Sequence, residues 1–325
     1  MNTFGRLFRV QILGESHGEG AGVLLDGVPA GIPLSVADFE TDIARRKPGA
    51  KGTTPRKEAD MPELKTGVFN GFTTGAPLLI WFSNENTRSS DYDWVKTQPR
   101  PGHVDWVAMQ KFHGFSDHRG GGHFSGRLTV CLVAAGVVAK KMLEGIKIQS
   151  TILEVGGEAD VEQGLEKAIA MKDSIGGIVE CRATGIPAGW GEPFWDSIES
   201  AIAHAAFAIP AVKGIEFGAG FRAARMMGTE HNDALMNATG QTVTNHAGGV
   251  VGGISNGNEL VFRVAVKPTA STPKPQQSFN LETNAIETFS VKGRHDLCIA
   301  LRVPVVLESI AAIALADFKL LAAAF

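Results

Sequence analysis

Four glycine-rich clusters of the sequence gather the residue types that do acid–base chemistry. An imidazole can release a proton near neutral pH, whereas a carboxylate can accept one. Glycine beside them lets the backbone approach a ligand closely. We expect these separated loops to fold into one site. The clusters read GESHGEG at 14–20, RPGHVDW at 100–106 with HRGGGHFSGR at 118–127, TNHAGGVVGGISNG at 244–257 running into VAVKPTAS at 264–271, and KGRHDLC at 292–298.

Cationic side chains beside these clusters indicate an anionic ligand. The planar guanidinium group of arginine suits carboxylates and phosphates, and nearby hydroxyls can complete such a site. Arg127 precedes a long apolar run and is expected near the interior, where an unpaired charge is costly. Arg45 and Arg119 fit solvated surface charges equally well. The full set is Arg45, Arg46, Arg100, Arg119, Arg127, Arg294 and Lys267, with the hydroxyls of Ser125, Thr269 and Ser271.

The histidines, serines and glycines of these clusters favour metal binding, serine catalysis and nucleotide binding less. His113, His118 and His123 recur every fifth residue, a spacing that a helix would spread over different faces, and no cysteine pair or HExxH motif accompanies them. Ser16 precedes His17 directly, which does not resemble a G-x-S-x-G nucleophile. The phosphate-binding G-x-x-x-x-G-K-[ST] motif is absent, and GGGHFSG is a poor dinucleotide fingerprint. We expect no metal site.

The composition is that of an ordinary globular protein. Of the 325 residues 44% are hydrophobic and 20% are charged, and the formal net charge of −3 gives no bulk attraction to nucleic acid or to an anionic membrane. Cys131, Cys181 and Cys298 are too few and too widely spaced for a disulfide framework or a zinc ribbon. The N-terminus has no signal-peptide pattern, and by this reading no run is long and apolar enough to cross a bilayer. We expect a cytoplasmic protein.

Apolar runs bounded by glycine and proline predict β-strands. They lie at 6–13, 20–28, 66–72, 76–83, 150–157, 175–187, 214–221 and 259–268. Capping residues and small apolar runs predict helices from Ser35 to Lys47, from about Ser125 to 145, over 193–210 and over 304–325. The stretch from Asn84 to Gly122 lacks periodicity and is expected to be a functional or mobile loop.

The order of these elements predicts the fold class. Each half gives glycine-rich strands and hairpins followed by a long helix of small residues, without a regular strand–helix alternation. We therefore expect a layered α+β fold with helices packed between antiparallel sheets. The chain is expected to form a single domain over 1–325 with an internal pseudo-repeat.

Longer motifs resemble one known family, the chorismate synthases, in the same order along the chain. The resemblance runs from Phe8 to beyond Ala316. It implies a β-α-β sandwich, typically a homotetramer, that converts 5-enolpyruvylshikimate 3-phosphate to chorismate by a 1,4-anti elimination of phosphate at the end of the shikimate pathway. It also implies a need for reduced FMN. The motifs are GESHGEGAGVLLDGVPAGIPL, TTPRKEAD, RPGHVDW, RGGGHFSGRLT, DSIGGIVECRATGIPAGWGEP, AVKGIEFGAGF, NHAGGVVGGISNG, VKPTAS and KGRHDLC followed by PVVLES.

The resemblance also implies roles for particular residues. His17 is expected to act on the reduced flavin, His103 to protonate the departing phosphate, and Asp296 to remove the substrate proton together with flavin N5. The substrate-binding residues implied are Arg46, Arg100, Ser125, Arg127 and Arg294. The flavin-binding residues implied are His123, Phe124, Ser125, Val243, Thr244, Gly252, Lys267, Pro268, Thr269, Ala270, Ser271 and Arg294.

The sequence departs from the family pattern in two motifs. His123 and Gly52 stand where arginine is common, and Lys51 beside Gly52 can replace an arginine only as a point charge. The chain is also short around Ala159, around 238–244 and beyond Phe325. Two questions stay open at this level: whether NADPH or an external reductant reduces the flavin, and whether the chain is instead a non-catalytic flavin- or nucleotide-binding module or a metal-dependent hydrolase.

Overall fold

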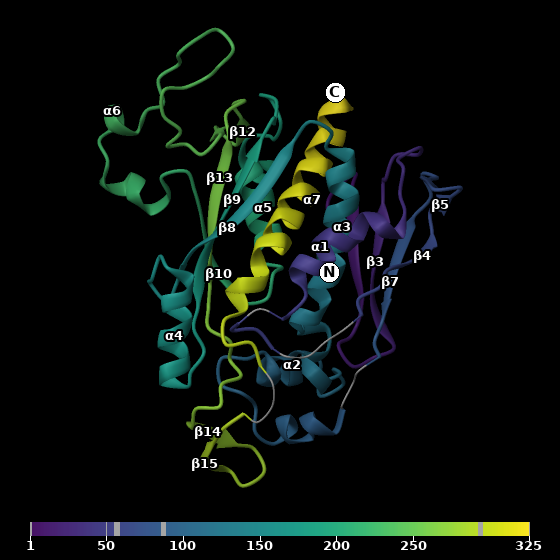
Figure 1. Cartoon of the computed structure of the whole chain (residues 1–325), viewed down its shortest axis with the longest axis vertical. Coiled ribbons are helices and arrows are strands. Elements are labelled where there is room, and N and C mark those ends of the chain that lie inside the picture. Colours follow the sequence, from purple (N-terminus) through teal and green to yellow (C-terminus); the bar gives the residue numbers. More distant parts are fainter. Residues whose placement is uncertain (1, 50, 55–58, 86–88, 292–294, 325) are drawn as a thin grey trace.

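The two long helices of this chain, α3 (Thr129–Met142) and α7 (Val303–Ala323), lie between two antiparallel sheets (Figure 1). The computed structural model describes residues 2–49, 51–54, 59–85, 89–291 and 295–324. The first sheet has the strand order β1 (Thr3–Phe4), β2 (Arg9–Gly14), β3 (Gly20–Asp26), β7 (Leu78–Ser83), β4 (Glu63–Thr66). The second has the order β10 (Val212–Phe217), β13 (Leu260–Val266), β9 (Gly177–Thr184), β8 (Lys147–Val155). The predicted layered α+β fold is confirmed.

Helices and short hairpins complete the fold. The α-helices are α1 (Glu40–Arg46), α2 (Asp105–Lys111), α3 (Thr129–Met142), α4 (Val161–Met171), α5 (Ile198–Ala206), α6 (Gly228–His231) and α7 (Val303–Ala323). The 3₁₀ helices are η1 (Val36–Phe39), η2 (Ser89–Lys96), η3 (Arg119–Phe124), η4 (Gly126–Leu128), η5 (Phe194–Asp196), η6 (Gly220–Arg225) and η7 (Ile299–Arg302). The hairpins pair β5 (Val68–Phe69) with β6 (Phe72–Thr73), β11 (Val250–Val251) with β12 (Ile254–Ser255), and β14 (Gln276–Asn280) with β15 (Ala285–Phe289).

Alternating apolar residues turn one face of each sheet toward the helices. The fully buried positions are Ala21, Val23 and Leu25 on β3 and Leu78, Ile80 and Phe82 on β7. Successive side chains of a strand point to opposite faces, so this spacing of two builds a continuous apolar surface. The register that pairs Val23 with Ile80 keeps these side chains on the same face.

The long helices α3 and α7 lie side by side in the middle layer (Figure 1). A β-carbon placed on Gly136 would lie 2.3 Å from Cβ of Ser309, so the two backbones approach as closely as small residues permit. The expectation that no run is long and apolar enough to cross a membrane is wrong: residues 119–142 and 299–323 meet that length and composition. Both segments are mostly buried, 67% and 78% of their apolar windows, so their apolarity is that of core helices.

A buried carboxylate ties α7 to three neighbouring elements. Glu308 accepts two hydrogen bonds from the guanidinium of Arg45, both at 2.7 Å, and one from Lys140 at 3.2 Å. It also accepts the backbone N–H of Ser150 at 2.9 Å. Arg45 therefore serves the packing of α1 on α7, and Arg119 likewise pairs locally with Asp117.

Most predicted elements coincide with observed ones, and three differences stand out. Every predicted strand overlaps a strand of the structure, and the helix from Ser35 begins with the expected capping box. The helix predicted over 193–210 begins only at Ile198, because Ser197 caps it by accepting the N–H of Ser200. Helix α4 was missed, and the stretch 84–122 contains η2, α2 and η3 rather than a plain loop. The single domain and its pseudo-repeat stay a prediction.

Candidate active site

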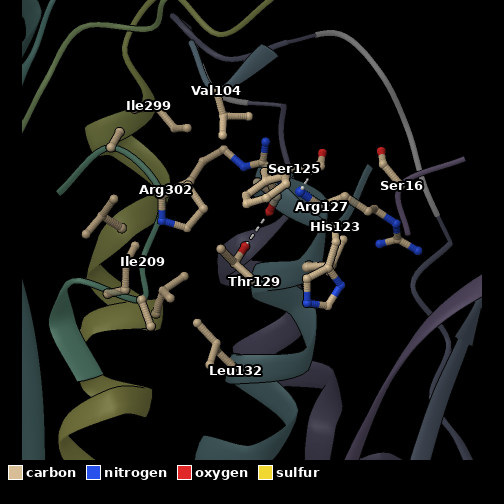
Figure 2. A pocket seen from close by; sticks show the side chains of 18 of the residues that line it. Ser16, Val104, His123, Ser125, Arg127, Thr129, Leu132, Ile209, Ile299 and Arg302 are labelled. Carbon is tan, nitrogen blue, oxygen red and sulfur yellow. Dashed lines mark hydrogen bonds between the residues drawn. The ribbon is translucent and has the colours of Figure 1, made fainter. Parts of the chain in front are cut away.

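A cavity of about 820 Å³ lies where α3 and α7 begin. His123, Ser125 and Arg127 approach it from the start of α3, while Leu132 and Ile209 form an apolar part (Figure 2). The helix dipole makes the N-terminal end of each helix partly positive, which favours bound anions. The predicted residues that line the cavity are Arg46, Arg100, His103, His123, Phe124, Ser125, Arg127, Lys267, Thr269, Ala270, Ser271 and Asp296.

Two buried arginines share one carboxylate at the cavity wall. Asp60 accepts from Arg46 Nη1 at 2.9 Å and also pairs with Arg127. Arg46 is fixed further by Thr129 Oγ1 at 3.0 Å and by the carbonyl of Arg127 at 3.1 Å. Burial, together with the positive charges of Arg302 and Arg127, lowers the pKa of Arg46 to about 10, although Asp60 opposes that shift. An anion that enters the cavity would favour the charged form of Arg46.

Asn84 joins Arg127 to the loop of the first glycine cluster. Its side-chain oxygen accepts from Arg127 Nε at 3.2 Å. Its side-chain nitrogen lies within 3.2 Å of the carbonyl oxygens of Glu15, Ser16 and Gly18. One amide thereby fixes both the GESHG loop and the guanidinium.

His17 lies behind the cavity wall rather than on it. It is only 6% exposed, and its ring meets that of Tyr92 edge-on, with 5.1 Å between ring centroids. Gly120, which lines the cavity, has φ +59° and stands directly against the imidazole. Of the GESHG loop, Ser16 is among the described residues that line the cavity. The proton-transfer role of His17 stays a prediction.

His103 belongs to a compact group at the start of α2. Asp105 Oδ1 lies 2.6 Å from His103 Nδ1 and 2.8 Å from Arg100 Nη2. Asp105 Oδ2 accepts from Arg100 Nε at 2.7 Å, and Arg100 Nη1 donates to Ser271 Oγ at 3.1 Å. The RPGHVDW and VKPTAS motifs, far apart in the sequence, are thus in direct contact.

Asp296, which also lines the cavity, is held by two donors. Its oxygens accept the backbone N–H of Thr54 at 2.9 Å and Arg302 Nη1 at 3.2 Å. Arg302 also donates through Nε to the carbonyl of Arg46 at 3.0 Å. Lys51 points elsewhere, toward Glu162 of α4 at 2.8 Å.

Hydrogen bonds to neighbouring segments hold the VKPTAS loop in place. Ser174 Oγ donates to the carbonyl of Thr269 at 2.7 Å, and Lys267 Nζ donates to that of Gly102 at 3.1 Å. Burial, and then repulsion from Lys213, lowers the pKa of Lys267. On the other wall, His123 Nδ1 donates to the carbonyl of Gly14 at 2.8 Å, because a carbonyl can only accept.

Several predicted residues lie outside this cavity. Val243 and Thr244 belong to the segment around α6 that extends from the body (Figure 1), where Val243 is 67% exposed. Gly252 lies in the turn between β11 and β12. Pro268 is not among the described lining residues, and Arg294 falls outside the described part of the chain. The structure therefore does not bring Val243, Thr244 or Gly252 to this site within one chain.

Sequence reasoning missed four polar residues of the site: Asp60, Asn84, Asp105 and Arg302. Asp105 lies two residues after His103 within a motif already singled out, so a carboxylate beside a candidate imidazole was the available signal. Asn84 and Arg302 stand in no glycine cluster. Within the ranges that the structure describes, no three His, Cys, Asp or Glu residues form a metal-binding group.

Comparisons with known proteins agree over nearly the whole chain. The family described as chorismate synthase matches residues 8–320. A chorismate synthase of Chitinophaga pinensis is 68% identical over 322 residues, 99% of this chain and 97% of the relative. One from Korarchaeum cryptofilum is 45% identical and covers 97% of this chain and 96% of the relative. A solved structure titled "Crystal Structure of Chorismate Synthase" has a TM-score of 0.75 at 27% identity, covering 98% of this chain and 93% of that chain.

Proposed function

Because this chain belongs to the chorismate synthase family, we propose that its cavity binds 5-enolpyruvylshikimate 3-phosphate beside reduced FMN and eliminates phosphate from it. The family makes it a lyase of the shikimate pathway, in the synthesis of aromatic amino acids. The proposal adds the substrate, the flavin and the residues that act on them. The three buried arginines Arg46, Arg100 and Arg127, which line a cavity at the start of α3 and α7, are the observation that carries it.

The charge distribution of the cavity supports a substrate with a phosphate and two carboxylates. Arg46, Arg100 and Arg127 are each at most 8% exposed. Guanidinium groups held in fixed positions bind such anions through paired hydrogen bonds, which are stronger in a site shielded from water. Ser125 caps the helical turn before α3 and also lines the cavity.

The cavity also has room and donors for a flavin. Its volume of about 820 Å³ lies in the upper range for small-molecule sites, and its apolar part suits a flat ring system. Thr269 Oγ1 is buried without a hydrogen-bond partner in the described part of the chain, as expected for a group that contacts a ligand. Lys267 to Ser271, His123 and Phe124 are the residues proposed to hold it. When bound, the reduced flavin supplies the electron density that assists loss of phosphate.

The chain's own acid and base act on opposite ends of this reaction. His103 is proposed to donate the proton on Nε2 to the phosphate oxygen as the C–O bond breaks. Asp296, oriented by Thr54 and Arg302, is proposed to accept the substrate proton. His17 is proposed to influence the flavin from behind Gly120, and Val243, Thr244, Gly252 and Arg294 remain proposed flavin contacts.

Anaerobic phosphate release tests this function. With photoreduced FMN we expect turnover, and with oxidised FMN none. His103→Ala is expected to lower the rate by about 10²–10⁴, the usual contribution of a general acid. His113→Asn, at an exposed histidine that is not among the described lining residues, is the control and should leave the rate unchanged. Full activity with oxidised flavin, or in His103→Ala, would show the proposal to be wrong.

Two further properties belong to the same proposal. NADPH is a candidate reductant of the flavin. Adding NADPH to oxidised FMN in the anaerobic assay tests this directly.

A homotetramer is supported by large apolar side chains that a single chain exposes, such as Phe194, Trp195 and Phe221, each more than 80% exposed. Light scattering after gel filtration measures the oligomer. The buried free cysteines fit a reducing compartment such as the cytoplasm.

A further inference from the structure

The carboxylate of Asp105 contacts both the proposed acid, His103, and its cationic neighbour Arg100. Asp105 is 6% exposed and lies at the first position of α2. It accepts two side-chain hydrogen bonds from Arg100, the backbone N–H of Arg100 at 3.1 Å, and a contact of 2.6 Å from His103 Nδ1. Such a carboxylate can orient an imidazole without itself meeting the substrate.

The hydrogen bonds of Asp105 determine which nitrogen of His103 carries a proton. Burial alone would raise the pKa of Asp105, but hydrogen bonds from Arg100 and His103 hold that pKa well below its usual range. An ionised carboxylate only accepts hydrogen bonds, so the 2.6 Å contact requires a proton on His103 Nδ1. The 3.0 Å contact between Arg100 Nη2 and His103 Nδ1 then joins two donors that both point at Asp105 Oδ1.

We propose that Asp105 is a positioning residue that keeps His103 in the Nδ1–H form, so that Nε2 is the ring nitrogen that exchanges a proton with the bound phosphate ester. The surroundings of Nε2 agree. A β-carbon on Gly121 would lie 3.8 Å from it, so a residue without a side chain is its neighbour there. The His103 side chain lines the cavity and is 23% exposed.

The proton balance needs no rearrangement of the ring. In the acid form both nitrogens carry protons. The Nε2–H bond breaks toward a phosphate oxygen, the electron pair stays on Nε2, and the neutral ring keeps its Nδ1–H bond to Asp105. Water returns a proton to Nε2 for the next cycle. Besides Arg100 and Asp105, Lys267 also contacts this segment, through the carbonyl of Gly102.

Nitrogen NMR of the whole protein tests the assignment without flavin or substrate. The chain has nine histidines, and His103→Gln identifies the signals of His103 in protein labelled with ¹⁵N-histidine. Above the pH at which the ring loses its charge, we expect a protonated Nδ1 and an unprotonated Nε2. A protonated Nε2 in the wild type would overturn the proposal, whether or not any Asp105 variant folds.

Asp105→Asn tests the cause. Its amide can donate to Nδ1 and so favours the Nε2–H form, in which Nε2 no longer accepts. We expect a mixed or reversed proton signature and a rate lowered toward that of His103→Ala, with little further loss when both changes are combined. Asp117→Asn, which also removes a carboxylate paired to an arginine, should change neither. An unaltered signature and rate in Asp105→Asn would refute the inference. Only the rate measurement rests on the proposed function, so a failed NMR result and a failed reaction are distinguishable.

Discussion

Gly120→Ala places a methyl group between the glycine turn and His17. A β-carbon there would lie 2.4 Å from His17 Cδ2, 2.6 Å from Nε2 and 2.9 Å from Ser16 Oγ. Packed carbon atoms do not approach so closely, and the imidazole is enclosed by Tyr92 on another side. The ring must therefore move, or the turn must open.

The expected cost has two parts. Holding alanine at φ +59° costs about 1–2 kcal/mol, and forcing a methyl into a packed region costs about 1–3 kcal/mol. Gly121→Ala is the matched control: its φ of +83° is no less strained, but its nearest neighbour, His103 Cε1, lies at an ordinary 3.7 Å. We therefore expect Gly120→Ala to lower the free energy of unfolding by about 1–3 kcal/mol more than Gly121→Ala does.

Urea unfolding measures this difference, and one signal reports its origin. Tyr92 is the single tyrosine of the chain, so labelling with tyrosine that carries ¹³C only at Cζ gives one ring signal beside His17. That signal should shift in Gly120→Ala and not in Gly121→Ala. Equal destabilisation by both variants, with an unmoved Tyr92 signal in Gly120→Ala, would refute the account of the glycine as a spacer for His17.

Other predictions concern the carboxylates. Asp60→Asn removes the shared partner of two buried arginines and should lower the free energy of unfolding, measured with urea, by about 3–5 kcal/mol. Asp317→Ala strips the acceptor from the backbone N–H groups of Arg6, Leu7 and Phe8; we expect a loss of about 1–3 kcal/mol and faster amide exchange at these residues. The pKa of Asp105 is lowered on folding, so its stabilisation is present above about pH 4 and is lost as the pH falls below that value. Stability measured at pH 7 and pH 3 should therefore change less in Asp105→Asn than in the wild type.

Local sequence patterns predicted the frame of the fold because its strands are apolar and bounded by glycine and proline. The strands β14 and β15 escaped that reasoning because their residues are polar and at most half-buried. Helix α4 could have been found: Asp160 caps it by accepting the N–H groups of Glu162 and Gln163, and its apolar residues recur at helical spacing.

Some residues of the candidate site could be predicted from the sequence and others could not. Glycine beside ionisable residues marked the loops that line the cavity, and the structure brings RPGHVDW and VKPTAS into contact. Asp60 and Asn84 act through partners 67 and 43 residues away, Arg127 in both cases. No local periodicity or spacing encodes such a contact, which exists only once the loops have folded. The roles of Asp60 and Asn84 therefore could not be predicted from the sequence alone.

The cavity arginines have carboxylate partners before any ligand arrives. The pairs are Arg46 and Arg127 with Asp60, Arg100 with Asp105, and Arg302 with Asp296. These carboxylates reduce the net positive charge, which by itself weakens the attraction for an anion. They also fix each guanidinium, so a bound phosphate ester need not order long side chains. Removing one carboxylate should therefore tighten the binding of inorganic phosphate while slowing turnover, because equilibrium affinity follows net charge whereas the reaction depends on orientation.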